Sequence, residues 1–168
     1  RYDFQTGYPI NRYMQPPHES VREIDCMGTN CAVWRRELFR AGVRFAPFFV
    51  GYAVVEDAHL ALQARTRGWR ILECGRARCV HNHSKRGRTD QRVVARRTAV
   101  NYRFLFVDTV PRRTWRQELR FWRVQAVELV RFAVAAVRHG GDNWRALLGK
   151  AEGIVAATRV RPGDVTPP

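Results

Sequence analysis

Glu56 and Asp57 form an acidic pair at the start of an apolar, helix-like segment, and this pair is well suited to chemistry. A helix dipole keeps a carboxylate at its N-terminus ionised, and the turn before the helix exposes the group to a cleft. Such a carboxylate can remove the proton of an acceptor hydroxyl, although an acidic pair that only stabilises its helix is the alternative. A small polar loop, Gly28–Asn30, and a histidine that ends a strand-like run, His81, accompany the pair. Together these features predict metal-assisted transfer of a group to a hydroxyl.

Helices and strands of ordinary length must position these residues. The spacing of apolar residues predicts a helix from Glu56 to the glycine at position 68. Alternating apolar and polar residues predict three strands, at residues 21–27, 69–74 and 77–81. Two further helices are expected at residues 35–40 and 91–107. Proline, glycine and aromatic residues predict loops at residues 1–20, with one short strand, and 44–52.

The order and spacing of these motifs resemble the C-terminal half of the catalytic domain of family-2 glycosyltransferases, which have the GT-A fold. The matching motifs are G-T-N, E-D, G-W-R-I-L and V-H, within residues 21–111. The resemblance implies an α/β fold in which residues 1–111 form the acceptor-side half of a GT-A, Rossmann-like domain. It implies that Asp57 is the catalytic base, with Glu56 beside it. It also implies that a loop next to the donor sugar and acceptor is formed by Gly28, Thr29 and Asn30, where glycine permits close approach and asparagine can bond a sugar hydroxyl.

The resemblance also bears on metal and diphosphate binding. His81 matches a histidine that can approach the metal or the diphosphate in many relatives, and a surface or capping role is the alternative. In this family the divalent ion, Mg or Mn, takes its main ligands from a D-x-D motif in the first half of the domain, and this chain has no D-x-D. The chain is therefore expected to be a fragment, inactive alone, whose missing N-terminal half holds most of the metal. Basic residues of the loop after His81 could hold the diphosphate, with solvated charge as the alternative: Lys85, Arg86 and Arg88.

The implied activity is transfer of a single sugar from a nucleotide-diphosphate sugar to an acceptor hydroxyl, with inversion, by a hexosyltransferase-type enzyme. The acceptor would be a saccharide or a lipid-linked molecule, in the synthesis of cell-envelope polysaccharide or glycolipid. The Q-x-x-R-W signature of processive synthases is absent, which favours single-sugar addition. Gln63 stands where many relatives have arginine, and Gly75 where they have proline. Two alternatives stay open: a non-catalytic basic module that binds membranes or polyanions, and a pseudo-enzyme without a donor half.

The C-terminal third is predicted to be a basic helical extension over residues 112–160, followed by a disordered tail at 161–168. A capping box of Thr114 and Gln117 predicts a helix that runs to residue 138, and a second helix over 143–158 contains two weakening glycines. On a helical wheel the arginines of the first helix form one stripe: Arg116, Arg120, Arg123, Arg131 and Arg138. Apolar residues form a second stripe roughly 120° away: Trp115, Leu119, Trp122, Ala126, Leu129, Ala133 and Val137.

The formal net charge is +15, and almost all of the positive charge is arginine. Such a surplus favours polyanionic partners, with an arginine-preferring genome and solvated side chains as the alternative. The basic amphipathic helix predicts docking on an anionic membrane surface, whereas packing of its apolar stripe on the catalytic core is the competing expectation. Nucleic acid is disfavoured because the tryptophans lie on a different stripe from the arginines. The expected location is the cytoplasm, with peripheral attachment to the inner face of the plasma membrane.

The chain has four cysteines, which could bind zinc or remain free thiols: Cys26, Cys31, Cys74 and Cys79. Two C-x-x-x-x-C pairs next to His81 and His83 are compatible with zinc. Each cysteine, however, lies in or beside an apolar, strand-like run, where a free thiol behaves as a small apolar side chain. We favour free cysteines in a reducing compartment, because nothing in the pattern requires a disulfide.

Overall fold

The computed structural model describes residues 1–10, 18–26, 31–51, 53–80 and 90–168. The chain is mixed α/β and mostly helical, which confirms the expected α/β class at this coarse level. Both sheets of the described residues are two-stranded and antiparallel, β1 with β2 and β3 with β4. None of the described helices is both long and apolar enough to cross a membrane. In chain order the elements are β1 (Tyr2–Asp3), β2 (Tyr8–Pro9), β3 (Val21–Ile24), α1 (Arg36–Arg40), α2 (Glu56–Thr66), β4 (Ile71–Cys74), α3 (Gln91–Thr109), α4 (Trp115–His139) and α5 (Asp142–Ala157).

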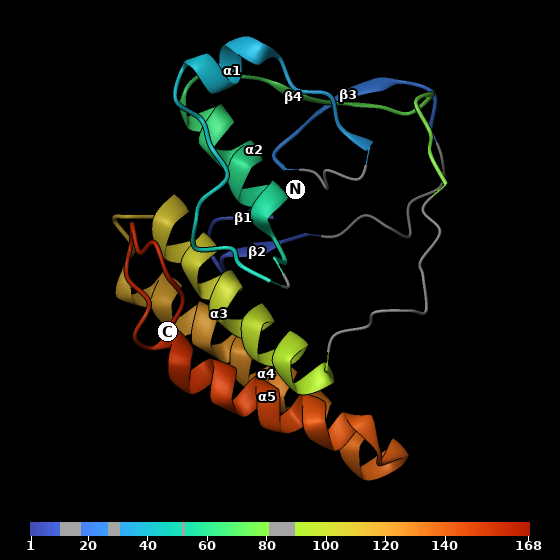
Figure 1. The fold of residues 1–168 in the computed structure, drawn as a ribbon, viewed down its shortest axis with the longest axis vertical. Coiled ribbons are helices and arrows are strands. Elements are labelled where there is room, and N and C mark those ends of the chain that lie inside the picture. The colour runs from blue at the N-terminus through green and yellow to red at the C-terminus, as the bar shows by residue number, and fades with distance from the viewer. Residues whose placement is uncertain (11–17, 27–30, 52, 81–89) are drawn as a thin grey trace.

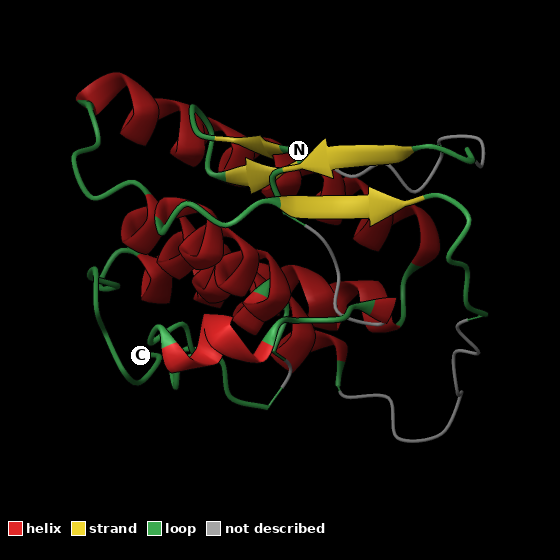
Figure 2. Cartoon of the chain, turned by 90° about the horizontal axis from the view of Figure 1, so that it is seen from above, coloured by secondary structure: helices red, strands yellow, loops and turns green. Residues whose placement is uncertain are grey.

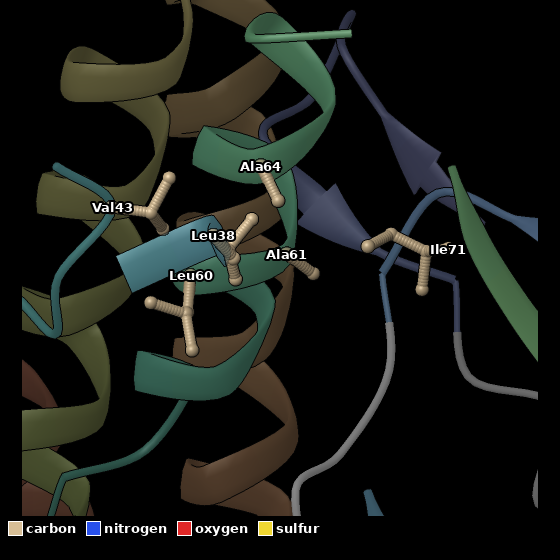
Figure 3. Packing of buried hydrophobic residues seen from close by; sticks show 6 residues of the cluster. All are labelled: Leu38, Val43, Leu60, Ala61, Ala64 and Ile71. Carbon is tan, nitrogen blue, oxygen red and sulfur yellow. The ribbon is translucent and has the colours of Figure 1, made fainter. Parts of the chain in front are cut away.

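The elements form two groups with the β1–β2 hairpin between them (Figure 1). The first group contains α1, α2 and the β3–β4 pair, and the second contains α3, α4 and α5. In Figure 2 the strands lie along one side of the helices. The first group is held by a buried apolar cluster from α1, the following loop, α2 and β4, shown in Figure 3: Leu38, Val43, Leu60, Ala61, Ala64 and Ile71. This cluster fixes α2, whose first turn contains the acidic pair.

Several helix ends follow chemistry that is visible in the sequence. Gly42 and Gly68 follow α1 and α2 with φ angles of 85° and 83°, in the left-handed region where glycine is favoured. The predicted capping box of α4 is confirmed: the Gln117 backbone N–H donates to the Thr114 hydroxyl at 3.3 Å, and the Thr114 N–H donates to the Gln117 side chain at 2.9 Å. The strand expected at 77–81 is not formed by residues 77–80, which are exposed and bury no face.

Helix α5 packs against α3 through two glycines. A Cβ atom at Gly149 would lie 2.7 Å from the Cα of Arg92, and one at Gly153 would lie 2.5 Å from the carbonyl oxygen of Arg96. No carbon atom fits at these distances, so glycine is required for the close approach of the two helices. The glycines that were expected to weaken this helix are therefore the residues that let it pack.

The N-terminal hairpin is tied to the C-terminal helices. The ring of Tyr8 stacks on Tyr102 of α3 with 4.4 Å between centroids, and its hydroxyl donates to Glu128 of α4 at 3.3 Å. Lys150 of α5 is buried, donates to Gln125 of α4 at 2.7 Å, and also pairs with Glu128. This network of polar groups joins β2, α4 and α5.

The residues after α5 return along α3. The Gly163 backbone N–H donates to Asp108 of α3 at 3.1 Å, and Arg96 donates to the carbonyl oxygen of Pro168 at 2.8 Å. Composition predicts disorder for residues 161–168, whereas the structure describes these residues in turns beside α3.

Candidate functional site

The predicted acidic pair occupies the first turn of α2. Glu56 is the first residue of the helix and Asp57 the second, and both are half-buried. The backbone N–H of Ala58 donates to Asp57 Oδ1 at 2.7 Å. The carboxylate thus lies at the positive end of the helix dipole. The pair is therefore the partly exposed start of a helix whose following residues are mostly buried.

The backbone directly before the pair is strained. Val55 has φ 66° and ψ 11°, and it is the non-glycine residue with a positive φ among the described residues. A β-branched side chain disfavours this left-handed conformation, at a cost of about 1–3 kcal/mol. Strain of this kind persists where surrounding contacts impose it, and it is common at active sites.

Contacts with α3 hold the strained turn. The buried side chain of Asn101 donates to the carbonyl oxygen of Val54 at 3.2 Å. Val55 itself packs, together with Cys26, on a buried cluster from β1, α2 and α3: Tyr2, Ala58, Leu62 and Leu105. Helix α3 therefore supports the turn through both a hydrogen bond and apolar packing, and so fixes the direction of the acidic pair.

Asp57 lies close to the segment that leads into the predicted sugar-binding loop. Burial raises the pKa of the Cys26 thiol, and the negative charges of Asp25 and Asp57 raise it further. The charge of Asp57 thus acts on a residue that stands two positions before Gly28 in the sequence. Cys26 also packs on the same buried cluster as Val55, so the start of α2 and the segment before the loop are neighbours in the fold.

The other end of the same loop meets the segment that leads to the predicted histidine. Cys31 directly follows the Gly28–Asn30 loop, and Cys79 precedes His81 by two residues. A hydrogen bond with the Cys31 thiol raises the pKa of the exposed Cys79 thiol, so these two residues lie side by side. Cys26, before the loop, thus lies near the acidic pair, and Cys31, after the loop, lies beside Cys79 in the segment that leads to His81.

The two carboxyl groups of the pair have different surroundings. Burial raises the pKa of Glu56, backbone N–H groups at the helix start act in the opposite direction, and the charge of Asp57 raises it again. Glu56 therefore holds a proton more readily than an exposed glutamate does. Active sites that use two carboxyl groups for different roles, one protonated and one ionised, often have an environment that disfavours the charge of one of them.

A buried polar chain on α2 was not identified from the sequence. His59 Nε2 lies 2.7 Å from a carboxylate oxygen of Asp108, and its Nδ1 lies 2.9 Å from the side-chain nitrogen of Gln63. That amide nitrogen can only donate, so His59 accepts at Nδ1 and donates from Nε2. The hydrogen bond from His59 lowers the pKa of Asp108. The spacing of His59 and Gln63, one helical turn apart, was the available sequence signal.

The other predicted site residues lie outside the described ranges and stay predictions: Gly28, Thr29, Asn30, His81, Lys85, Arg86 and Arg88. Cys26, Cys31, Cys74 and Cys79 are free thiols. Within the described ranges no three His, Cys, Asp or Glu side chains are placed to bind a metal ion. The described residues therefore do not form a site for the expected Mg or Mn ion by themselves.

Cys26, which precedes the Gly28–Asn30 loop in the sequence, packs on the same buried cluster as Val55 at the start of α2, and Cys31 and Cys79 lie side by side. Asp57 provides a carboxylate with a helix dipole behind it. Chemically, such a group can accept a proton from a bound hydroxyl. Comparisons with protein-family models, with curated proteins and with solved structures find no match to this chain.

Proposed function

We propose that this chain is the acceptor-side half of an inverting, metal-dependent glycosyltransferase with the GT-A fold. The observation that carries the proposal is the position of Asp57, on the first turn of α2, just after the strained Val55, which packs on the same buried cluster as Cys26. The sequence resemblance requires the acidic pair, the G-T-N loop and the strand-end histidine to share one site. Two observations support that requirement: Cys26 packs on the same cluster as Val55 at the start of α2, and Cys31 lies beside Cys79, two residues before His81.

Asp57 is the base in this proposal. As the acceptor hydroxyl attacks the anomeric carbon of the donor, its proton passes to the Asp57 carboxylate, a C–O bond forms, and the bond to the diphosphate breaks. Attack from the side opposite the leaving diphosphate inverts the anomeric carbon. The helix N-terminus stabilises the charge of Asp57 before the proton arrives. Glu56, whose charge burial disfavours, suits a positioning role next to the base.

Donor binding is assigned to a partner half outside these 168 residues, because the chain contains no D-x-D. That half would also hold most of the divalent ion, and we derive no step of the reaction through the ion. Lys85, Arg86 and Arg88 are the proposed contacts to the diphosphate, and His81 is the proposed contact to the metal. The saccharide or lipid-linked acceptor, and the addition of a single sugar in cell-envelope synthesis, follow from the resemblance.

Replacement of Asp57 by asparagine, in a polypeptide that joins this chain to its donor-binding half, tests the proposal. Asparagine can still accept the hydrogen bond from Ala58, so the fold should be retained. An amide cannot take the proton, so turnover should fall by ~10²–10⁴-fold. Glu37→Gln is the matched control, because Glu37 is an exposed acid in the first turn of α1 and should leave turnover unchanged. Release of nucleoside diphosphate from uridine and guanosine diphosphate sugars, with a lipid-linked saccharide as acceptor, measures turnover.

Two outcomes contradict this assignment in different ways. Turnover of Asp57→Asn within a few-fold of the wild type would remove Asp57 from the role of base. Failure of the joined wild-type polypeptide to transfer any of these sugars would favour the second candidate function, a non-catalytic basic module. The exposed arginine-rich side of α4 is the observation that favours that second candidate.

A further inference from the structure

Helix α4 packs on the rest of the protein with one side. Its buried residues are Phe121, Gln125 and Ala136. Phe121 stacks on Phe106 of α3 with 5.1 Å between centroids, and Gln125 accepts from Lys150 of α5. The opposite side is exposed along the length of the helix. We call this exposed side the outer face of α4.

The outer face contains positive charge without negative charge. Five exposed arginines lie on it: Arg116, Arg120, Arg123, Arg131 and Arg138. None of them forms an ion pair with another residue in the described part of the chain. Both acidic residues of α4 point inward, Glu118 to a pair of arginines and Glu128 to a buried lysine. The charges of the outer face are therefore available to an anionic partner.

The outer face also exposes large apolar side chains. Trp115 is 70% exposed, Val130 62% and Val137 76%. The remaining members of this apolar set are Leu119, Val127 and Val134. A row of apolar side chains of this size beside unpaired charges is typical of an interaction surface. The competing expectation, that the apolar stripe packs on the core, holds only for its partly buried members such as Trp122, which lies under the Arg103 guanidinium.

We propose that the outer face of α4 docks the protein on a bilayer surface that contains anionic phospholipid headgroups. A helix with arginine and apolar residues on one exposed side lies in the plane of the interface, with its apolar groups at the boundary of headgroups and acyl chains. Helix α4 has 25 residues and so would lie along about 37 Å of the surface. Tryptophan prefers the headgroup level, which places Trp115 there. Arginine near an anionic leaflet gains attraction that salt screens.

Two other occupants fit the outer face less well. A second copy of the chain would place five arginines against five others, with no carboxylate on either outer face. Single-stranded nucleic acid is bound by aromatic residues interleaved with basic ones, whereas the apolar residues here are mostly valines, which offer no ring for stacking. Docking through the outer face of α4 does not depend on the catalytic role of Asp57.

Co-sedimentation with vesicles tests the charged part of the proposal. The wild-type chain should bind vesicles of phosphatidylglycerol mixed with phosphatidylcholine, and binding should weaken as salt is added. The triple variant Arg123→Gln, Arg131→Gln, Arg138→Gln should bind about 100-fold more weakly, because each arginine contributes about fivefold, the equivalent of roughly 1 kcal/mol. A matched control removes the same charge from exposed residues of α1 and of the segment after β4: Arg36→Gln, Arg40→Gln and Arg76→Gln. The control should change binding only a few-fold.

Tryptophan fluorescence tests the apolar part. On binding, the emission of Trp115 should shift to shorter wavelength and should be quenched by brominated lipid, and the difference from Trp115→Phe isolates its signal from the other tryptophans. The double variant Leu119→Ser, Val137→Ser should bind vesicles more weakly than the wild type. Its fold should stay intact, because both side chains are exposed.

Three results would overturn the proposal. The first is no binding to anionic vesicles at low salt. The second is an equal loss of binding in the control triple variant, which would mean that net charge, and not the outer face, is responsible. The third is a dimer, seen by light scattering without lipid, that the Leu119→Ser, Val137→Ser variant abolishes, which would assign the face to a second copy of the chain.

Discussion

The contact between α3 and α5 predicts that Gly149→Ala destabilises the protein, although alanine is the better helix former. In an open helix this replacement would stabilise by about 1 kcal/mol. Here the new Cβ would lie 2.7 Å from the Cα of Arg92, well inside the ~3.5–4.0 Å at which carbon atoms pack. The atoms it meets belong to the backbone of α3, which cannot turn aside as a flexible side chain can. The two helices must therefore separate by about 1 Å.

The expected size of the effect follows from two opposing terms. Overpacking of a well-fitted contact costs about 1–3 kcal/mol, and the separation also loosens the neighbouring contact of Gly153 with Ala99. After the gain of about 1 kcal/mol in helix propensity, we expect the free energy of unfolding to fall by roughly 1–2 kcal/mol. For a chain of 168 residues this corresponds to a decrease in Tm of about 2–8 °C.

Urea unfolding followed by circular dichroism measures this change. Ala151→Gly is the matched control, because Ala151 is exposed on the same helix and its replacement should cost about 1 kcal/mol through helix propensity alone. The control establishes that α5 unfolds in the measured transition. A Gly149→Ala variant that is as stable as the wild type, or more stable, would refute the backbone contact between α3 and α5.

Two further predictions concern carboxyl groups. Glu118→Gln should lower the free energy of unfolding by roughly 2–3 kcal/mol in urea titrations, because it leaves the buried Arg103 guanidinium, 8% exposed, without its partner at 2.7 Å. Glu23→Gln, which breaks an exposed pair with Arg70, should cost less than about 1 kcal/mol, and equal losses would contradict the reasoning. Glu56→Gln should stabilise the protein at neutral pH. The pKa of Glu56 is raised in the folded state, so protonated Glu56 favours folding below the ordinary pKa of 4.5, and this stabilisation is lost as pH rises through the higher folded pKa. Unfolding measured from acid to neutral pH should show a gain that grows with pH, and a constant difference would argue against a buried, ionising Glu56.

The first turn of α2 shows what the sequence can and cannot predict about the site. The helix after Glu56 and its end near Gly68 follow from apolar spacing and from the conformational freedom of glycine, both of which are local properties. The left-handed conformation of Val55 could not be predicted, because valine avoids it and tertiary contacts impose it. The hydrogen bond from Asn101 that holds this turn joins residues 47 positions apart. A single sequence contains no local signal for such a pair.

Helix α4 shows a second limit. The helical wheel separates its arginines from one apolar stripe, and the structure confirms that the five arginines share the exposed side, where several valines accompany them. The wheel does not identify the side that packs, because Gln125 and Glu128 are polar and are expected to face water. Their partners, Lys150 and Tyr8, belong to other elements and make burial of these groups favourable. The same reasoning explains Gly149, which is required because the backbone of α3 lies too close for a side chain.

The link between Tyr8 and Glu128 has a consequence for the order of events during synthesis. The two residues are separated by 120 positions, which a ribosome adding about 5–20 residues per second covers in about 6–24 s. The buried lysine that completes the network, Lys150, is made later still. The N-terminal hairpin must therefore wait, without its final partners, until most of the polypeptide has left the ribosome. During that interval a chaperone or protease has access to Tyr2 and Gly7, which are buried in the finished protein.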